Sequence, residues 1–145
     1  MSAFADSSAL VKLYADEDGH EAVRKLDVIA ASALARVEVP AALWGKVRMG
    51  QLEPADASTL VQEFEADFFG TEEEPPRFAV LAVAMAVLED AAARAAAYGL
   101  RAYDAVQLAS AIAVRQADED CDSLACFDRD LRDAAAACGF ALIPE

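Results

Sequence analysis

The sequence predicts an α/β fold in which helices cover both faces of a parallel sheet of four to five strands. Short apolar segments alternate along the chain with longer helical segments, and this alternation builds parallel sheets through right-handed crossover connections. The apolar segments do not alternate between polar and apolar residues, which is typical of strands buried on both faces. The 145 residues contain neither a repeat nor a linker, so we expect one domain over residues 1–145.

The first half of the chain is expected to contain two strands and three helices. In order they are a strand over 3–5, helices over 9–14 and 20–26, a strand over 28–32 and a helix over 34–49. The acidic segment 16–19 ends in glycine and separates the first two helices. Gly50 follows the third helix at the position after its C-cap, where glycine is favoured.

The second half continues the alternation. We expect a helix from 54 to 68 or 69, a strand over 78–82, an alanine-rich helix that ends at 98, a helix over 104–116, a strand over 123–127, a helix over 128–138 and a closing strand over 140–143. Pro54 suits the first turn of its helix. By itself the run 78–82 cannot be distinguished from a helix, because a short apolar run has no diagnostic period.

The chain is strongly acidic, with 26 Asp and Glu against 12 Lys and Arg and a formal net charge of −14. This charge argues against binding nucleic acid through a general basic surface, because such binding depends on Lys and Arg at the phosphates. It also argues against a basic face for membrane binding. A hydrophobic content of 57 % is too high for a disordered acidic tail. An acidic pocket that binds cations remains compatible with the composition.

Cysteine usage and the apolar runs indicate the compartment. The three cysteines are odd in number and form no CxxC pair, which favours a reducing environment over a disulfide framework. The N-terminus has no basic segment followed by an apolar one. The longest apolar run, 78–88, is shorter than the ~20 residues that a bilayer requires. We therefore expect a cytoplasmic protein without membrane association.

Four carboxylates stand at the junctions between the expected elements. Asp6 directly follows the first strand, and Asp128 directly follows the fourth. Asp104 opens the helix that leads to the fourth strand, and Pro40 places Glu38 near the start of its helix, because proline is tolerated in the first turn. Parallel sheets bind ligands at the carboxyl ends of their strands, so these side chains are expected to share one edge.

Each acid taken alone also has a simpler interpretation. Aspartate is among the best N-cap residues, so Asp6, Asp104 and Asp128 are candidate helix caps. Residues 104–107 resemble a capping box that ends in Gln107. Glu38 does not fit this account, because glutamate is a poor N-cap. Both interpretations stay open at the level of the sequence.

Together the four acids would create an electrostatic conflict. Two carboxylates ~5 Å apart repel each other by roughly 3 kcal/mol at an effective dielectric constant of ~20. Either protons or a divalent cation must compensate for this repulsion. Oxygen ligands without neighbouring histidine or cysteine favour Mg²⁺ or Mn²⁺ over zinc.

Four segments then resemble a known family in order and spacing. They are 5–14 (ADSSALVKLY), 32–38 (SALARVE), 99–109 (GLRAYDAVQLA) and 126–131 (CFDRDL). In these segments the chain resembles PIN-domain proteins, especially the VapC-type toxins of bacterial toxin–antitoxin pairs. The resemblance extends over essentially the whole chain. It implies a three-layer α/β/α sandwich and a metal-dependent endoribonuclease that hydrolyses RNA phosphodiester bonds with metal-activated water.

The resemblance also implies site residues. By position, Asp6, Glu38, Asp104 and Asp128 are the catalytic acids that hold Mg²⁺ or Mn²⁺. The family often has Ser or Thr where this chain has Cys126, two residues before the fourth acid, and Asp130 is an alternative to Asp128. Ser7 is expected to support Asp6 rather than to act as a nucleophile. Four basic residues lie beside the acids and are candidates either for RNA contacts or for charge balance: Lys12, Arg36, Arg101 and Arg129.

The implied partners are an RNA substrate, a small cognate antitoxin and a second copy of the chain in a homodimer. Two other functions remain in competition with the ribonuclease. One is a Mg²⁺-dependent phosphoryl-transfer enzyme with an aspartyl nucleophile, which would carry a DxD motif where this chain has Asp6, Ser7 and Ser8. The other is a non-catalytic PIN-like module that only binds a partner.

Overall fold

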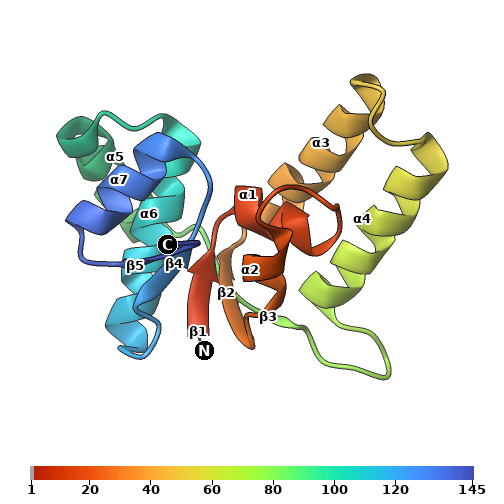
Figure 1. The fold of residues 1–145 in the computed structure, drawn as a ribbon. Helices are drawn as coiled ribbons and strands as arrows, with labels where there is room; N and C mark the ends of the chain where they lie inside the picture. The colour runs from red at the N-terminus through yellow and green to blue at the C-terminus, as the bar shows by residue number, and fades with distance from the viewer. Residues whose placement is uncertain (1) are drawn as a thin grey trace.

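The computed structural model describes residues 2–145 and contains a central sheet of five parallel strands (Figure 1). The strands are β1 (Ser2–Ala5), β2 (Val28–Ser32), β3 (Phe78–Leu81), β4 (Ser123–Ala125) and β5 (Ala141–Ile143). Their spatial order is β3-β2-β1-β4-β5. Both the parallel sheet and its number of strands agree with the prediction.

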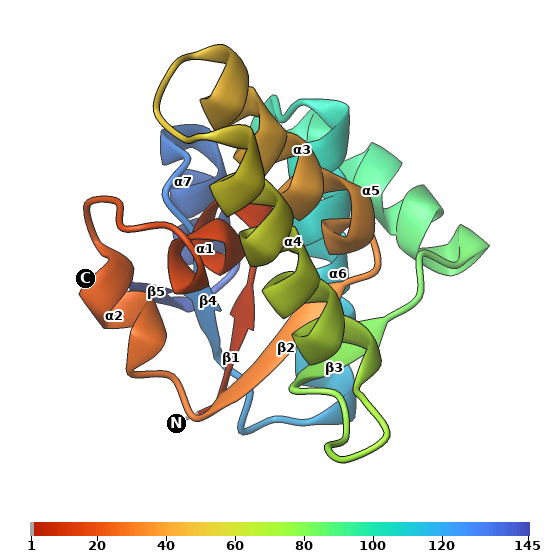
Figure 2. The ribbon, with the colours of Figure 1, turned by 90° about the vertical axis from the view of Figure 1, so that its right-hand side faces the viewer.

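Helices cover both faces of this sheet. One layer contains α1 (Ser7–Leu10), the 3₁₀ helix η1 (Val11–Leu13), α2 (His20–Arg24), α3 (Ala35–Arg48) and α4 (Pro54–Phe69). The other contains α5 (Met85–Tyr98), α6 (Ala102–Ala117) and α7 (Arg129–Ala137). Figure 1 shows the two layers on either side of the strands, and Figure 2 shows α1–α4 from their own side. The three-layer α/β/α sandwich is therefore confirmed.

Residues 3–5 of the central strand β1 are apolar because each face of the strand meets a different core. Ala3 and Ala5 pack with Leu10 and the helices of the first layer, whereas Phe4 packs with Leu108 of α6 in the second layer. All of these side chains are completely buried. Burying a Leu or Phe side chain contributes roughly 1.5–3 kcal/mol, so β1 is stabilised from both faces.

The strand order creates a crevice beside β1. The connection from β1 to β2 runs through the α1–α2 layer, and the connection from β4 to β5 runs through α7 on the opposite face. β1 and β4 are hydrogen-bonded neighbours, with Ala5 opposite Ala125. The chain thus leaves the two strands toward opposite layers. In open α/β sheets, ligands bind at such a point, outside the carboxyl ends of the strands.

Several element boundaries differ from those expected. The segment near 78–82 is a strand, paired with β2 at the edge of the sheet. The first helix begins at Ser7 instead of residue 9, because the Asp6 side chain caps it. The helix expected from Asp104 begins at Ala102. Pro40 lies inside α3 beyond the first turn, yet Glu38 is in that turn as predicted.

Two further expectations concern cysteines and membranes. Cys121, Cys126 and Cys138 are free, and the first two are buried. Over residues 2–145, none of the helices has the length and apolar character needed to cross a bilayer.

Candidate active site

The four acids singled out in the sequence meet in one pocket of about 390 Å³ at the carboxyl edge of the sheet. They come from four separate parts of the fold, after β1, in α3, in α6 and after β4. The pocket is lined by Asp6, Ser7, Ser8, Glu38, Arg101, Ala102, Tyr103, Asp104, Gln107 and Asp128. The structure thus brings the four candidate acids together, as expected from the sequence, and their roles stay a prediction.

Asp6 occupies the centre of the hydrogen-bond network after β1 and is only 4 % exposed. Its Oδ1 accepts hydrogen bonds from the Ser8 hydroxyl at 2.7 Å and from the Ala9 backbone N–H at 3.0 Å. The Ser8 hydroxyl in turn accepts from the Phe127 N–H at 3.1 Å. One serine therefore connects the acid after β1 to the backbone that follows β4.

Glu38 projects from the first turn of α3 and is held by two donors. Its Oε1 accepts from the Ser7 hydroxyl at 3.0 Å and from Gln107 Nε2 at 2.9 Å. The expectation that Ser7 supports Asp6 is wrong, because Ser8 takes that role and Ser7 supports Glu38. The capping-box interpretation of 104–107 is also wrong, because the Gln107 side chain points to Glu38.

Asp104 and Asp128 complete the acidic set from the α6 and α7 side. Asp104 lies in the first turn of α6 and caps no helix. Asp128 is the N-cap of α7, and its Oδ1 accepts from the Leu131 N–H at 3.0 Å. Asp6 and Asp128 thus cap a helix, as the simpler interpretation predicts, and they also line the pocket. Asp130 is exposed and does not line the pocket.

Two carboxylates of this pocket, those of Asp6 and Asp104, have raised pKa values. Burial raises the pKa of Asp6 to about 7, assisted by the charges of Asp104 and Glu38 and opposed by the hydrogen bonds from Ser8 and Ala9. Burial, and then the charge of Asp128, also raises the pKa of Asp104, while Arg101 acts in the opposite direction. Negative charge in the pocket is thus incompletely compensated by the protein, which is the situation that a proton or a cation relieves.

The donor set fits a hard divalent cation. The lining contains four carboxylates and three hydroxyls but neither histidine nor cysteine, which is the ligand chemistry of Mg²⁺ and Mn²⁺. Within residues 2–145, no three His, Cys, Asp or Glu side chains lie close enough together to hold an ion between them.

The four basic residues that were candidates for RNA contacts lie at different distances from the pocket. Arg101 lines the pocket with its side chain 84 % exposed, and its Nη2 lies 3.9 Å from Asp128 Oδ2. Lys12 is buried, pairs with Glu17 at 2.9 Å and does not line the pocket. Arg36 pairs with Glu65 at 3.3 Å, and Arg129 is exposed at the start of α7.

Cys126 does not line the pocket either. Its side chain is completely buried in the core between the sheet and the α5–α7 layer. Burial, followed by the charge of Asp6, strongly raises the pKa of its thiol, so this sulfur stays neutral. The Ser8 hydroxyl supports Asp6, and Asp128 is held by the Leu131 N–H.

Sequence reasoning missed two lining residues. Gln107 was interpreted as part of a helix cap, and Tyr103, which is 65 % exposed at the pocket, was not considered. Their positions next to Asp104 on α6 are the only signal that the sequence offers for either residue.

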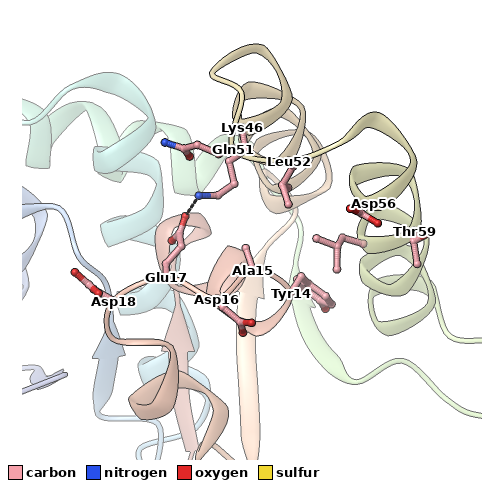
Figure 3. A pocket seen from close by; sticks show the side chains of 11 residues that line it. Tyr14, Ala15, Asp16, Glu17, Asp18, Lys46, Gln51, Leu52, Asp56 and Thr59 are labelled. Atoms are coloured by element: carbon pink, nitrogen blue, oxygen red, sulfur yellow. Dashed lines mark ion pairs between the residues drawn. The ribbon is translucent and has the colours of Figure 1, made fainter.

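A second cavity, of about 720 Å³, lies between the loop after η1 and the ends of α3 and α4 (Figure 3). It also contains acids, but its central one, Glu17, pairs with both Lys12 and Lys46. Burial raises the pKa of Glu17, and the hydrogen bonds from the two lysines outweigh it and lower this pKa overall. The protein therefore compensates the charge of Glu17 itself, which distinguishes this cavity from the one around Asp6.

Comparisons with known proteins agree with the fold. A family model described as the PIN domain matches residues 3–137. Among solved structures, the chain is similar to the crystal structure of PAE2754 from Pyrobaculum aerophilum, with 25% sequence identity and a TM-score of 0.63. The match covers 99% of this chain and 84% of that chain. A search of curated proteins finds no match. With a family model covering nearly its whole length, the chain belongs to the PIN domain family.

Proposed function

We propose that this protein is a Mg²⁺- or Mn²⁺-dependent endoribonuclease and the toxin of a toxin–antitoxin pair. PIN domains are typically nucleases that use divalent metal ions. The observation that carries the proposal is the convergence of Asp6, Glu38, Asp104 and Asp128 in one pocket, where burial raises the pKa of Asp6 to about 7. A site that concentrates four carboxylates suits a divalent cation.

In this proposal Asp6 and Asp104 bind the cation, and Glu38 and Asp128 complete the site directly or through water. When bound, a divalent cation lowers the pKa of water and stabilises the negative charge that develops on the phosphodiester oxygens. Because the pKa of Asp6 is about 7 in the ion-free protein, Asp6 releases a proton when the cation binds near neutral pH.

The serines of the pocket act as supports. The Ser8 hydroxyl donates to Asp6, and the Ser7 hydroxyl donates to Glu38. None of the lining residues is a histidine that could take a proton from either hydroxyl. In this proposal both hydroxyls are used as donors that hold the acids in place, and water is the nucleophile.

RNA binding must come from local contacts, because the net charge of −14 repels the phosphate backbone. Arg101 is the basic residue that lines the pocket. Its exposed guanidinium lies beside Asp128 at 3.9 Å, where it is placed to contact a phosphate entering the acidic pocket. Arg129 at the start of α7 is a second candidate for such a contact.

The test is cleavage of an end-labelled single-stranded RNA by the purified protein with Mg²⁺, with Mn²⁺ and with EDTA. We expect cleavage that requires the metal and is lost in Asp6→Asn and Asp104→Asn. Asp130→Asn is the matched control, because Asp130 is exposed outside the pocket and its variant should retain activity. Metal binding without cleavage of any RNA would instead support the non-catalytic partner-binding alternative.

The toxin role rests on the resemblance of four sequence segments to VapC-type toxins. An acidic toxin suits a basic antitoxin, since complementary charge accelerates association. Expression of the chain without the neighbouring gene should arrest growth, whereas Asp6→Asn should not. Normal growth in the presence of folded wild-type protein would contradict the toxin role while leaving the nuclease untouched. Light scattering of the purified chain tests the expected homodimer.

A further inference from the structure

The Gln107 side chain is the least expected member of the pocket. It is 3 % exposed and lies in the middle of a completely buried stretch of α6. Its Nε2 donates to Glu38 Oε1 at 2.9 Å and to the Ser7 hydroxyl oxygen at 3.2 Å. Because Ser7 also donates to Glu38 Oε1 at 3.0 Å, the three side chains form a closed triangle that joins α1, α3 and α6.

The other end of the same amide is unsatisfied. Gln107 Oε1 is a buried atom without a hydrogen-bond partner among residues 2–145. Burying an unpaired carbonyl is unfavourable, and an apolar residue of similar size would fill this position without it. The amide is thus useful here only through its N–H groups, and both of their acceptors line the pocket.

The orientation of the amide follows from its partners. Turned over, its carbonyl oxygen would face the carboxylate oxygen of Glu38, and two acceptors would repel each other. Both hydrogen bonds converge on Oε1, so Oε2 is the atom of Glu38 that stays available to a ligand within the described part of the chain.

We propose that Gln107 is a positioning residue that holds Glu38 in one orientation, with Oε2 free for the cation. The inference deepens the proposed function and rests on it. Gln107 touches neither substrate nor cation and acts only through Glu38. Ser7 supports Glu38 together with Gln107. Its hydroxyl donates to the same carboxylate oxygen and accepts a hydrogen bond from the Gln107 amide.

The test is Mn²⁺ affinity of the purified protein, measured by the electron paramagnetic resonance signal of free Mn²⁺, so that it does not depend on catalysis. Gln107→Met keeps the volume of the side chain and removes both donors. Partners that orient a metal ligand are worth about 10–100-fold in metal affinity, so we expect the Kd for Mn²⁺ to rise by about ten-fold or more. Thermal unfolding should show that the variant is as stable as wild type, because the orphaned carbonyl is removed as well.

Ser110→Ala is the matched control. Ser110 lies on the same helix, is completely buried and also has a hydroxyl without a partner among residues 2–145, but it does not line the pocket. Its variant should bind Mn²⁺ like wild type. Loss of affinity in both variants would show a general effect of altering buried α6 and would overturn the proposal.

A double-variant cycle separates positioning from direct binding. On a Glu38→Ala background, Gln107→Met should cause no further change in Mn²⁺ affinity, because the group it positions is absent. An equal loss on both backgrounds would overturn the inference while leaving the metal site and the proposed function intact. If wild-type protein binds no Mn²⁺, the proposed function fails and the inference with it.

Discussion

Replacement of Asp6 by asparagine should stabilise the ion-free protein at alkaline pH. The pKa of Asp6 is raised by burial from 3.8 to about 7, so the folded state binds this proton more tightly than the unfolded chain does. The stabilisation associated with the protonated carboxyl is therefore complete below the unfolded pKa of 3.8 and is lost as the pH rises through about 7. Since one pKa unit corresponds to about 1.4 kcal/mol, the buried charge costs at most about 4 kcal/mol above the folded pKa.

Asparagine preserves the contacts that Asp6 makes. Its side-chain oxygen can accept from Ser8 and from the Ala9 N–H as the carboxylate does, and asparagine is as good an N-cap as aspartate. In EDTA near pH 8, the free energy of unfolding of Asp6→Asn, measured in urea, should therefore be about 2–4 kcal/mol higher than that of wild type. Near pH 4 the two values should be equal. Asp128→Asn is the control, because Asp128 is also an N-cap but its side chain is 33% exposed. A difference between Asp6→Asn and wild type that does not vary with pH would refute the reasoning.

Other predictions follow from the same structure. Saturating Mn²⁺ should raise the Tm of wild type by the equivalent of about 2.7 kcal/mol at 100-fold excess over Kd; a variant with both Asp6→Asn and Asp104→Asn should not respond. Arg101→Ala should raise KM several-fold and leave kcat nearly unchanged in steady-state RNA cleavage, because Arg101 is exposed at the rim; an equal fall in kcat would place it at the reacting phosphate. Tyr14→Phe should lower the free energy of unfolding by about 1–3 kcal/mol in urea, because the Tyr14 hydroxyl donates to Asp67 at 2.6 Å, and an unchanged midpoint would contradict this.

The fold was predictable mainly from the central strands, whose apolar composition reflects their burial. β1 is apolar on both faces, and both faces meet a core. The position of Asp6 at the end of β1 follows from that pattern alone. Helix starts were less predictable, since Ala102 gives no capping signal and α6 begins there without a side-chain cap.

The supports of the acids could not be found by spacing. Ser7 and Gln107 are 100 residues apart, and Glu38 and Gln107 are 69 apart, so their contact depends on how α1, α3 and α6 pack together. A capping box is a local pattern, and the sequence alone therefore assigns Gln107 to a helix cap. Only the packing shows that Glu38 receives its amide instead.

The acidic residues of the chain lie in two different electrostatic environments. Around Glu17 the protein supplies its own cations, Lys12 and Lys46, and the pKa of Glu17 is lowered. Around Asp6 burial is the main effect and raises the pKa of its carboxyl, and Arg101 lies 3.9 Å from Asp128 at the exposed rim. The net charge of −14 therefore does not argue against a phosphodiester substrate as such. Under the proposed function, such a substrate would depend on a cation in the Asp6 pocket, because a strongly acidic surface attracts phosphates little.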